Sequence, residues 1–387
     1  MGKIMSVKWM KVVLLCLTLS RLCACAQPIT TALDPSVTPA QPTTDAPVQV
    51  ALLLPLHSEL FGSAAAAVRS GFLSALEHER GNFIITVVDS GDDVPAIVAT
   101  YRDLVTRYDI IVGPLSRGAV SLLAQSDDVR KPTIALVQPD LPASASAKRL
   151  PSQLLLMGLS IEDEARQIAA WTEREKKPGK VFTLSTNIAW QRRAANAFAQ
   201  QARQLGMTVD NLELNQSGNG LNASALAQLT QRIQAERPAL LFIALDAAQT
   251  MQLRNAIGNE LPLYGTSQLN PLNQSARLAA DKHLPGLNGV YLVDIPWQLQ
   301  ANHPAGMTVS QQAAGPAPNA DLERLHALGI DAFRVASQIA RQRSSFDLDG
   351  VTGQIYVNMT NAATYVQRRE TQAVYQDGVA VPLADQH

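Results

Sequence analysis

The sequence predicts an α/β protein of two lobes, each built around a mostly parallel, doubly wound sheet. Three observations support this fold class. Short segments rich in Val, Ile and Leu alternate with amphipathic segments of helical length. The alternation runs through two successive series, and 47% hydrophobic residues in a chain of 387 are ample for about two folding units. A long amphipathic helix at 321–343 then follows, which could return to the first series.

The first series begins at Val48, where an apolar run indicates a buried strand. We expect helices at 63–79 and 96–107 and a short one from 116 to 123. Strands are expected at 48–55, 83–89, 109–112, 132–137 and 153–157. Ser116 either caps its helix or, with nearby backbone N–H groups, binds an anion such as a carboxylate.

The second series opens at Ser160, a good N-cap, with Asp163 placed to complete a capping box. Glu162 and Glu164 favour the positive end of this helix, so we interpret these acids as solvated structure rather than as catalytic groups. Strands are expected at 181–185, 207–214, 240–245, 261–265 and 289–294, and helices at 189–205, 223–236, 247–257 and near 270–280.

The C-terminal part has a different pattern. The stretch 298–320 is long, polar and rich in Gly, Pro and Gln, which predicts a surface loop; it is either a protein contact or disorder without function. Beyond the long helix, residues 349–356 and 371–383 indicate short strands and a hairpin that turns at Asp377-Gly378.

The N-terminus has the features of an export signal. Residues 1–24 hold four basic residues and no acid, with an apolar run at 12–19. Leu22-Cys23-Ala24-Cys25 matches a bacterial lipobox, in which Cys25 receives the lipid. Ala26 rather than Asp follows this cysteine, which favours sorting to the outer membrane. Ordinary signal cleavage after Ala26 is the alternative.

Residues 25–47 form the expected tether. The segment contains five prolines and several threonines, with no aromatic or basic residue, so it cannot bury enough surface to fold. This tether is either a passive spacer or a segment that binds a partner protein. Removing residues 1–24 leaves 28 basic against 33 acidic residues, a mildly acidic body.

Composition and motifs exclude several classes of function. Nearly balanced charges (32 Lys+Arg, 33 Asp+Glu) and 5% aromatic residues argue against nucleic-acid binding. No dinucleotide or Walker glycine motif follows the first strand, and no G-x-S-x-G elbow occurs. The six histidines show no i+3 or i+4 pairing, and the three cysteines all lie within the first 25 residues. We therefore expect no metal, no cofactor and no enzymatic activity.

Ligands of doubly wound folds gather at the carboxyl ends of the strands. The turns at these ends define a candidate cleft, and a small ligand could bind there. Its candidate residues are His57, Ser58, Ser116, Arg117, Gln138, Asn187, Trp190, Asp246, Thr266 and Ser267.

Five segments carry a resemblance to a known family. They lie at 50–56, 110–115, 159–165 (Leu-Ser-Ile-Glu-Asp-Glu-Ala), 263–267 and 350–353 (Gly-Val-Thr-Gly). Together they are similar to the LppC/LpoA lipoproteins, outer-membrane activators of class A penicillin-binding proteins. The resemblance covers residues 48–387 and the lipobox. Enterobacterial members carry a helical-repeat domain between lipid and body, where this sequence has only the short tether.

The resemblance implies a type I periplasmic-binding-protein-like body used for protein contact. Lobe one would comprise 48–157 plus 294–345, and lobe two 158–293 plus 346–387. The implied function is non-enzymatic activation of a class A penicillin-binding protein in peptidoglycan synthesis. The protein would face the periplasm from the outer membrane. The alternative is a periplasmic receptor for an amino-acid-type ligand, serving an importer or sensor.

Overall fold

The computed structural model of the chain describes residues 46–384 apart from 80, 141–149, 176–178, 219, 274–275, 277–278, 280–281, 301–302, 304–318 and 361–362. The expected signal segment, Cys25 and nearly all of the expected tether lie outside the described residues. Most of the expected loop 298–320 and much of the expected helix near 270–280 do so as well. Within the described residues, no helix is both long and apolar enough to cross a bilayer.

The first sheet is five-stranded and fully parallel, in the order β2-β1-β3-β4-β5. Alternate residues of the buried strands point to its two faces. Helices α1 and α11 cover one face and α2 and α3 the other. The elements are β1 (Val48–Leu54), α1 (Gly62–His78), β2 (Phe83–Asp89), α2 (Val94–Arg107), β3 (Ile110–Val112), α3 (Arg117–Leu123), β4 (Thr133–Ala135), β5 (Leu154–Leu156) and α11 (Ala320–Ala340).

Helices α1 and α11 pack so closely that glycine is required on both. A Cβ on Gly71 would lie 1.9 Å from the carbonyl oxygen of His326, and one on Gly329 would lie 2.1 Å from that of Val68. The long C-terminal helix therefore returns to the first sheet, as the sequence pattern predicted.

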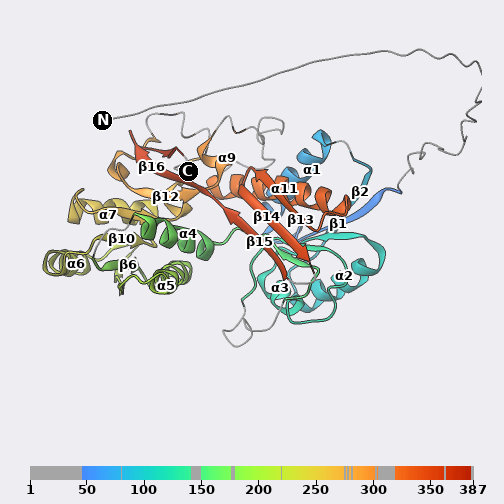
Figure 1. Ribbon diagram of the computed structural model, residues 1–387, viewed down its shortest axis with the longest axis horizontal. Coiled ribbons are helices and arrows are strands. Elements are labelled where there is room, and N and C mark those ends of the chain that lie inside the picture. Colours follow the sequence, from blue (N-terminus) through green and yellow to red (C-terminus); the bar gives the residue numbers. More distant parts are fainter. Residues whose placement is uncertain are drawn as a thin grey trace, which may run out of the picture. The chain divides into compact units, whose positions relative to one another are not determined.

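The second sheet has seven strands in the order β17-β16-β12-β11-β10-β6-β7. Its strands β16, β12, β10 and β6 are labelled in Figure 1. The five strands from β12 to β7 are parallel, and the C-terminal hairpin joins antiparallel. Helices α4 and α5 cover one face, and α6 and α7 the other. The elements are α4 (Ile161–Arg174), β6 (Val181–Ser185), α5 (Ala189–Gln204), β7 (Val209–Glu213), α6 (Ala223–Glu236), β10 (Leu240–Ile243), α7 (Ala247–Ile257), β11 (Leu263–Gly265), β12 (Tyr291–Asp294), β16 (Thr371–Gln376) and β17 (Val379–Pro382).

Short elements complete this region. Residues Asn270–Asn273, where the expected helix near 270–280 begins, are not helical, and a 3-10 turn precedes them. The expected loop starts inside a helix, because α9 ends at Leu299. The short elements are β8 (Gln216–Ser217), β9 (Gly220–Leu221), η1 (Ser267–Leu269), η3 (Pro285–Leu287) and α9 (Pro296–Leu299).

A separate antiparallel sheet consists of β13 (Ser345–Gly350), β14 (Gly353–Thr360) and β15 (Ala363–Arg369). Its apolar side chains Phe346, Val351, Ile355 and Val357 belong to the core of the first sheet. This corrects the expectation that all of 346–387 lies in lobe two: only the hairpin β16–β17 joins the second sheet. The physical reason is the alternation along β13 and β14, which gives the small sheet one apolar face to bury.

The chain passes between the two sheets three times. The first crossover links β5 to α4, the second links β12 and α9 to α11, and the third links β15 to β16. These crossovers lie far apart in sequence, and the side chains at their ends meet in the polar clusters described next.

Candidate functional site: the carboxyl edges of the two sheets

At the first sheet, the predicted hydroxyl residues satisfy backbone groups of their own turns. Ser58 is buried, and its Oγ accepts a hydrogen bond from the backbone N–H of Phe61 at 2.9 Å. Ser116 is the N-cap of α3 and accepts from the N–H of Ala119 at 3.4 Å. The capping role expected for Ser116 is therefore confirmed.

Two exposed ion pairs account for the charged candidates at this edge. His57 is 83% exposed and its Nδ1 lies 2.7 Å from Oδ2 of Asp89. This hydrogen bond holds the pKa of Asp89 below its usual range, against a smaller opposing effect of burial. Arg117 lies 3.4 Å from Asp140. Such pairs contribute little to stability.

At the second sheet, the structure brings some of the candidates together. Asp246 caps α7 through a reciprocal capping box with Gln249. Asp246 and Ser267 line one cavity of about 480 Å³ with Asn270 and Arg324. Thr266, next to Ser267, is fully buried and its Oγ1 has no hydrogen-bond partner among the described residues.

The other two candidates at this sheet precede and begin α5. Asn187 is exposed and Trp190 half-buried. Neither residue lines that cavity. The structure therefore brings Asp246 and Ser267 together in one cavity, whereas Asn187 and Trp190 lie outside it.

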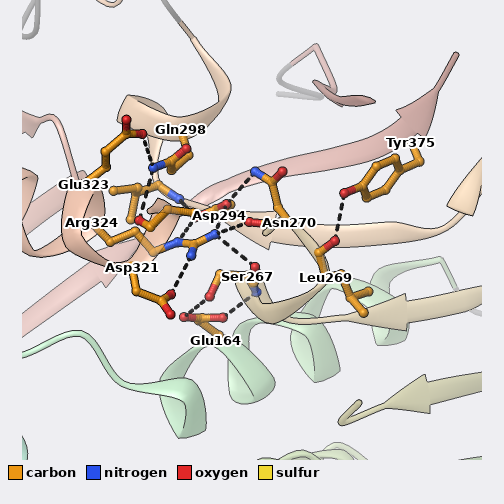
Figure 2. A network of polar contacts seen from close by, with 12 residues as sticks. Glu164, Ser267, Leu269, Asn270, Asp294, Gln298, Asp321, Glu323, Arg324 and Tyr375 are labelled. Atoms are coloured by element: carbon orange, nitrogen blue, oxygen red, sulfur yellow. Dashed lines mark hydrogen bonds and ion pairs between the residues drawn. The ribbon is translucent and has the colours of Figure 1, made fainter. Parts of the chain in front are cut away.

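A buried arginine is the centre of the polar network at this edge (Figure 2). Arg324, on α11, binds Asp294 in a bidentate manner, through Nε at 3.0 Å and Nη2 at 2.7 Å. Its Nη2 also donates to the carbonyl oxygens of Ser267 and Asn270 at 3.0 and 2.9 Å. Asp294 is fully buried, and Arg324 is 6% exposed. Burial alone would lower the pKa of Arg324, but the Asp294 carboxylate raises it, so the guanidinium stays charged.

A second buried acid joins this network from α4. The Glu164 carboxylate accepts from the backbone N–H of Ser267 at 2.7 Å and from its Oγ at 3.0 Å. Burial raises the pKa of Glu164 to about 8, and the negative charge of Asp294 adds to the effect, while the hydrogen bonds from Ser267 and the charge of Arg324 oppose it. The interpretation of Glu164 as a solvated helix-start acid is therefore wrong, since its side chain reaches across to η1.

Ser160 does cap α4, accepting from the N–H of Asp163 at 3.2 Å. The side chain of Asp163 instead pairs with Arg166 at 2.6 Å. No capping box is formed here, so only half of that expectation is confirmed.

A second arginine connects the remaining crossovers. Arg368, at the end of β15, donates from Nη2 to the carbonyl oxygen of Met157 at 2.7 Å and from Nη1 to that of Gly158 at 3.4 Å. The predicted Gln138 donates to the same Gly158 oxygen at 3.4 Å. Beside it, Glu370 is buried, and burial raises its pKa well above the ordinary value. Arg368 therefore fixes the first crossover to the third.

The Gly350-Val-Thr-Gly353 motif has a structural role in the same region. Asp331, fully buried on α11, accepts from the N–H groups of Val351 and Thr352 at 3.1 and 2.7 Å and from Thr352 Oγ1 at 2.6 Å. Thr352 Oγ1 in turn accepts from Arg368 Nε at 3.1 Å. The turn between β13 and β14 is thus tied to α11 and to Arg368.

These contacts describe a scaffold rather than a reactive centre. The side chains of Glu164, Asp294, Asp331, Arg324 and Arg368 are bound to backbone amides, carbonyl oxygens and one another. Oε2 of the buried Glu370 has no hydrogen-bond partner among the described residues. No group of three or more His, Cys, Asp or Glu side chains within the described part of the chain could hold a metal ion. The arrangement holds the crossovers in one geometry.

Sequence reasoning missed Arg324, Asp294, Arg368 and Glu370. One signal was available for α11: Arg324 and Asp331 are seven residues apart, so both lie on the apolar stripe of this helix. Charged residues on such a stripe are buried and paired. Nothing comparable marks Arg368, which lies in a strand whose pairing the sequence did not reveal.

Comparison with known proteins agrees with the observed fold. A family model described as "LppC putative lipoprotein" matches residues 43–378. Two curated relatives are "Penicillin-binding protein activator LpoA" of Haemophilus influenzae, 28% identical, and of Pasteurella multocida, 26% identical. Each alignment covers 87% of this chain and 55% of the relative. The chain thus spans about half the length of these curated relatives.

Solved structures show the same fold. The LpoA (YraM) C-domain from Haemophilus influenzae, "a regulator of PBP1A", has a TM-score of 0.68 and 24% identity, covering 87% of this chain and all of that one. A "putative branched-chain amino acid ABC transporter" from Chromobacterium violaceum has a TM-score of 0.67 and 32% identity, covering 85% and 100%. The predicted fold class, two lobes of the periplasmic-binding-protein type, is confirmed. Because the family model matches most of its length, the chain belongs to the LppC lipoprotein family.

Proposed function

We propose that this protein is a non-enzymatic envelope lipoprotein that binds a class A penicillin-binding protein and activates it in peptidoglycan synthesis. The observation that carries the proposal is the family match over 43–378, which includes all three crossovers and every strand of the two large sheets except β17. The curated relatives are named as activators of penicillin-binding proteins, and not as enzymes. The similar C-domain is described as a regulator of one such protein.

The geometry supports a role in protein contact. Arg324 and Arg368 connect backbone segments that are distant in sequence, and the carboxylate of Asp294 is fully occupied by this linkage. A body held in this way presents surfaces of constant shape, and a rigid surface loses less conformational entropy when a partner binds.

The proposal includes the expected signal peptide, lipid anchor and tether. Residues 1–24 would be the signal peptide, Cys25 the lipidated residue and 25–47 the tether. Acyl chains would hold the protein in the outer membrane, facing the periplasm, with each buried methylene contributing about 0.8 kcal/mol. Metabolic labelling with a palmitate analogue checks this step: labelling should be lost in Cys25→Ser, and labelling that persists would contradict it.

The central test is a synthase assay. Purified class A penicillin-binding protein is given lipid-linked precursor with and without the full-length protein, and polymerisation and cross-linking rates are measured. We expect a saturable rate increase and direct binding in a pull-down. A heat-denatured sample of the same protein is the control. Absence of both binding and rate change would overturn the proposal.

A second candidate function rests on the cavity of about 480 Å³ beside Asp246 and Ser267. Its position at the carboxyl edge of a parallel sheet is typical of ligand sites, and the Chromobacterium violaceum protein is described as a "putative branched-chain amino acid ABC transporter". The protein would then be a receptor for an amino-acid-type ligand. A thermal-shift screen with amino acids and muropeptides discriminates, because a tight ligand raises the melting temperature.

A further inference from the structure

The small antiparallel sheet β13–β15 has one face that is polar throughout. Its strand register places three rows of three side chains on this face. Three of the nine are amides and two are tyrosines, and none is aliphatic. The rows are Ser345–Asn358–Tyr365, Asp347–Tyr356–Gln367 and Asp349–Gln354–Arg369.

The opposite face shows that this composition is specific to one side. It presents Phe346, Ile355 and Val357, which are buried in the core of the first sheet. The polar face is left accessible, with Gln354, Gln367 and Arg369 exposed and both tyrosines half-buried. The two tyrosine rings lie side by side, with centroids 5.8 Å apart.

Five of these nine side chains form one wall of a groove: Asp347, Gln354, Tyr356, Gln367 and Arg369. The other wall is the outer side of α4 with Gln201 of α5, and the volume is about 680 Å³, larger than the cavity beside Ser267. Two more amides, Gln167 and Gln201, face the sheet across this groove. Asp163 and Arg166 on α4 neutralise one another at 2.6 Å.

The side chains of the groove are suited to hydrogen bonding with an external ligand. Within the described residues, Gln367 and Arg369 have no side-chain hydrogen-bond partner. An amide has a donor and an acceptor in one plane, although Gln354 already donates to Asp349 at 2.6 Å and Gln167 already accepts from the backbone N–H of Glu370 at 2.9 Å. The face of a tyrosine ring offers an apolar platform beside its hydroxyl group. The lining carries three arginines and two aspartates, so its formal charge is close to neutral.

We propose that this groove binds a glycan strand built from N-acetylated sugars. Hydroxyl and acetamido groups alternate donors and acceptors as the amides do, and a sugar ring presents a C–H face that packs on tyrosine. The lining has one more arginine than it has aspartates, and this small positive charge suits a largely neutral glycan that carries occasional carboxylates. A nucleic acid would meet Asp163 and Asp347 in a groove without a strong basic field. An amphipathic helix would find only three aliphatic side chains in the lining, Ala170, Ile355 and Val366.

The inference goes beyond the proposed function, because glycan binding and synthase activation are measured separately. The test titrates the purified full-length protein with a hexamer of N-acetylglucosamine by calorimetry, and sediments it with purified peptidoglycan. We expect saturable binding of both. Tyr356→Ala, which removes the tyrosine that lines the groove, should weaken binding of the hexamer about tenfold, through loss of ring stacking. The double variant Gln367→Ala/Arg369→Ala should weaken it by a similar factor.

A matched control is Gln231→Ala, an exposed amide on α6 that does not line the groove. It should bind as the unchanged protein does. Circular dichroism of every variant separates lost folding from lost binding. Because Gln367 and Arg369 are exposed, the double variant still tests the groove if Tyr356→Ala does not fold. No binding of either probe, or equal binding by all folded variants, would overturn the proposal. Binding only to a synthase-derived peptide would assign the groove to a protein and overturn it as well.

Discussion

The carboxyl edges of the two parallel sheets carry similar residue types but use them differently. At the first sheet, Ser58 and Ser116 bind backbone N–H groups three residues away, and His57 and Arg117 form exposed ion pairs. At the second sheet, Ser267 is bound by Glu164, a residue 103 positions distant in the chain. The first edge therefore has short-range helix and turn caps and exposed ion pairs, whereas the second has a buried network that joins distant segments.

This difference separates two kinds of polar residue. A local cap stabilises one turn and contributes about 1 kcal/mol wherever the helix is placed. A buried network links elements that could otherwise separate, and losing one member leaves the other charges unpaired in a low dielectric. The second edge should therefore control how the crossovers are held, while the first edge tolerates substitution.

Arg324→Ala should have the largest effect. It leaves Asp294, which is fully buried, without its bidentate partner and removes donors from two carbonyl oxygens. We expect the free energy of unfolding to fall by about 3–5 kcal/mol, measured by urea denaturation. The control is Arg117→Ala at the first edge, where a change within about 0.5 kcal/mol is expected. Equal losses at both sites would break the comparison.

The raised pKa of Glu164, at the same edge, predicts that the stability of the folded protein depends on pH. Its pKa is raised from 4.5 to about 8, so between these values the folded state binds more protons than the unfolded state. Stability is thus greatest below the unfolded pKa and falls as pH rises through the folded one, by on the order of 2–4 kcal/mol. Glu370, also raised, contributes with the same sign.

Glu164→Gln tests this dependence, because the amide resembles the protonated acid and can keep both contacts with Ser267. Urea denaturation from pH 5 to pH 8 should show a flatter profile for the variant. Glu162→Gln is the matched control on the same turn. Burial acts to raise the pKa of Glu162, but hydrogen bonds from its own backbone and from Arg193 lower it. The Glu162→Gln variant should therefore lose as much stability between pH 5 and pH 8 as the unchanged protein does. Identical profiles for Glu164→Gln and the unchanged protein would contradict the assignment.

Much of the fold could be predicted from the sequence, because parallel strands and their helices have strong periodic patterns. The strands at 83–89 and 181–185 and the helices at 223–236 and 247–257 were predicted to the residue. The small sheet was harder. Strand β15 (Ala363–Arg369) alternates polar and apolar residues only weakly, so neither it nor its pairing with β14 was expected.

The candidate site was less predictable, since its contacts depend on tertiary structure. Asp246 and Ser267 follow strands of one parallel sheet, so their meeting at one edge could be expected. Glu164 has a sequence position that suits a helix dipole, and only the placement of η1 above α4 shows that it is buried. A local pattern cannot distinguish an exposed acid from one that a distant backbone amide binds.

Ser116→Ala should have a smaller effect, at the first edge. It removes the hydroxyl that accepts from the N–H of Ala119 at 3.4 Å, at the start of a helix of seven residues. We expect a loss of about 0.5–1 kcal/mol in urea denaturation. Ser116→Asn keeps a capping oxygen and should restore most of it. A loss comparable with that of Arg324→Ala would place Ser116 in a network rather than in a local cap.

The smallest effect is expected for His57→Ala. His57 is 83% exposed, so its pair with Asp89 is screened by water, and its loss should change stability by less than about 0.5 kcal/mol at pH 7. A lowered pKa of Asp89 stabilises the folded state above the unfolded pKa, and this contribution is lost as pH falls through the folded value. Titration of Asp89 by NMR should show its pKa returning toward the ordinary value in the variant, while the unfolding midpoint at pH 7 barely moves. A large stability loss without a change in that titration would mean that His57 has a packing role, and the first edge would no longer be a set of short-range caps and exposed ion pairs.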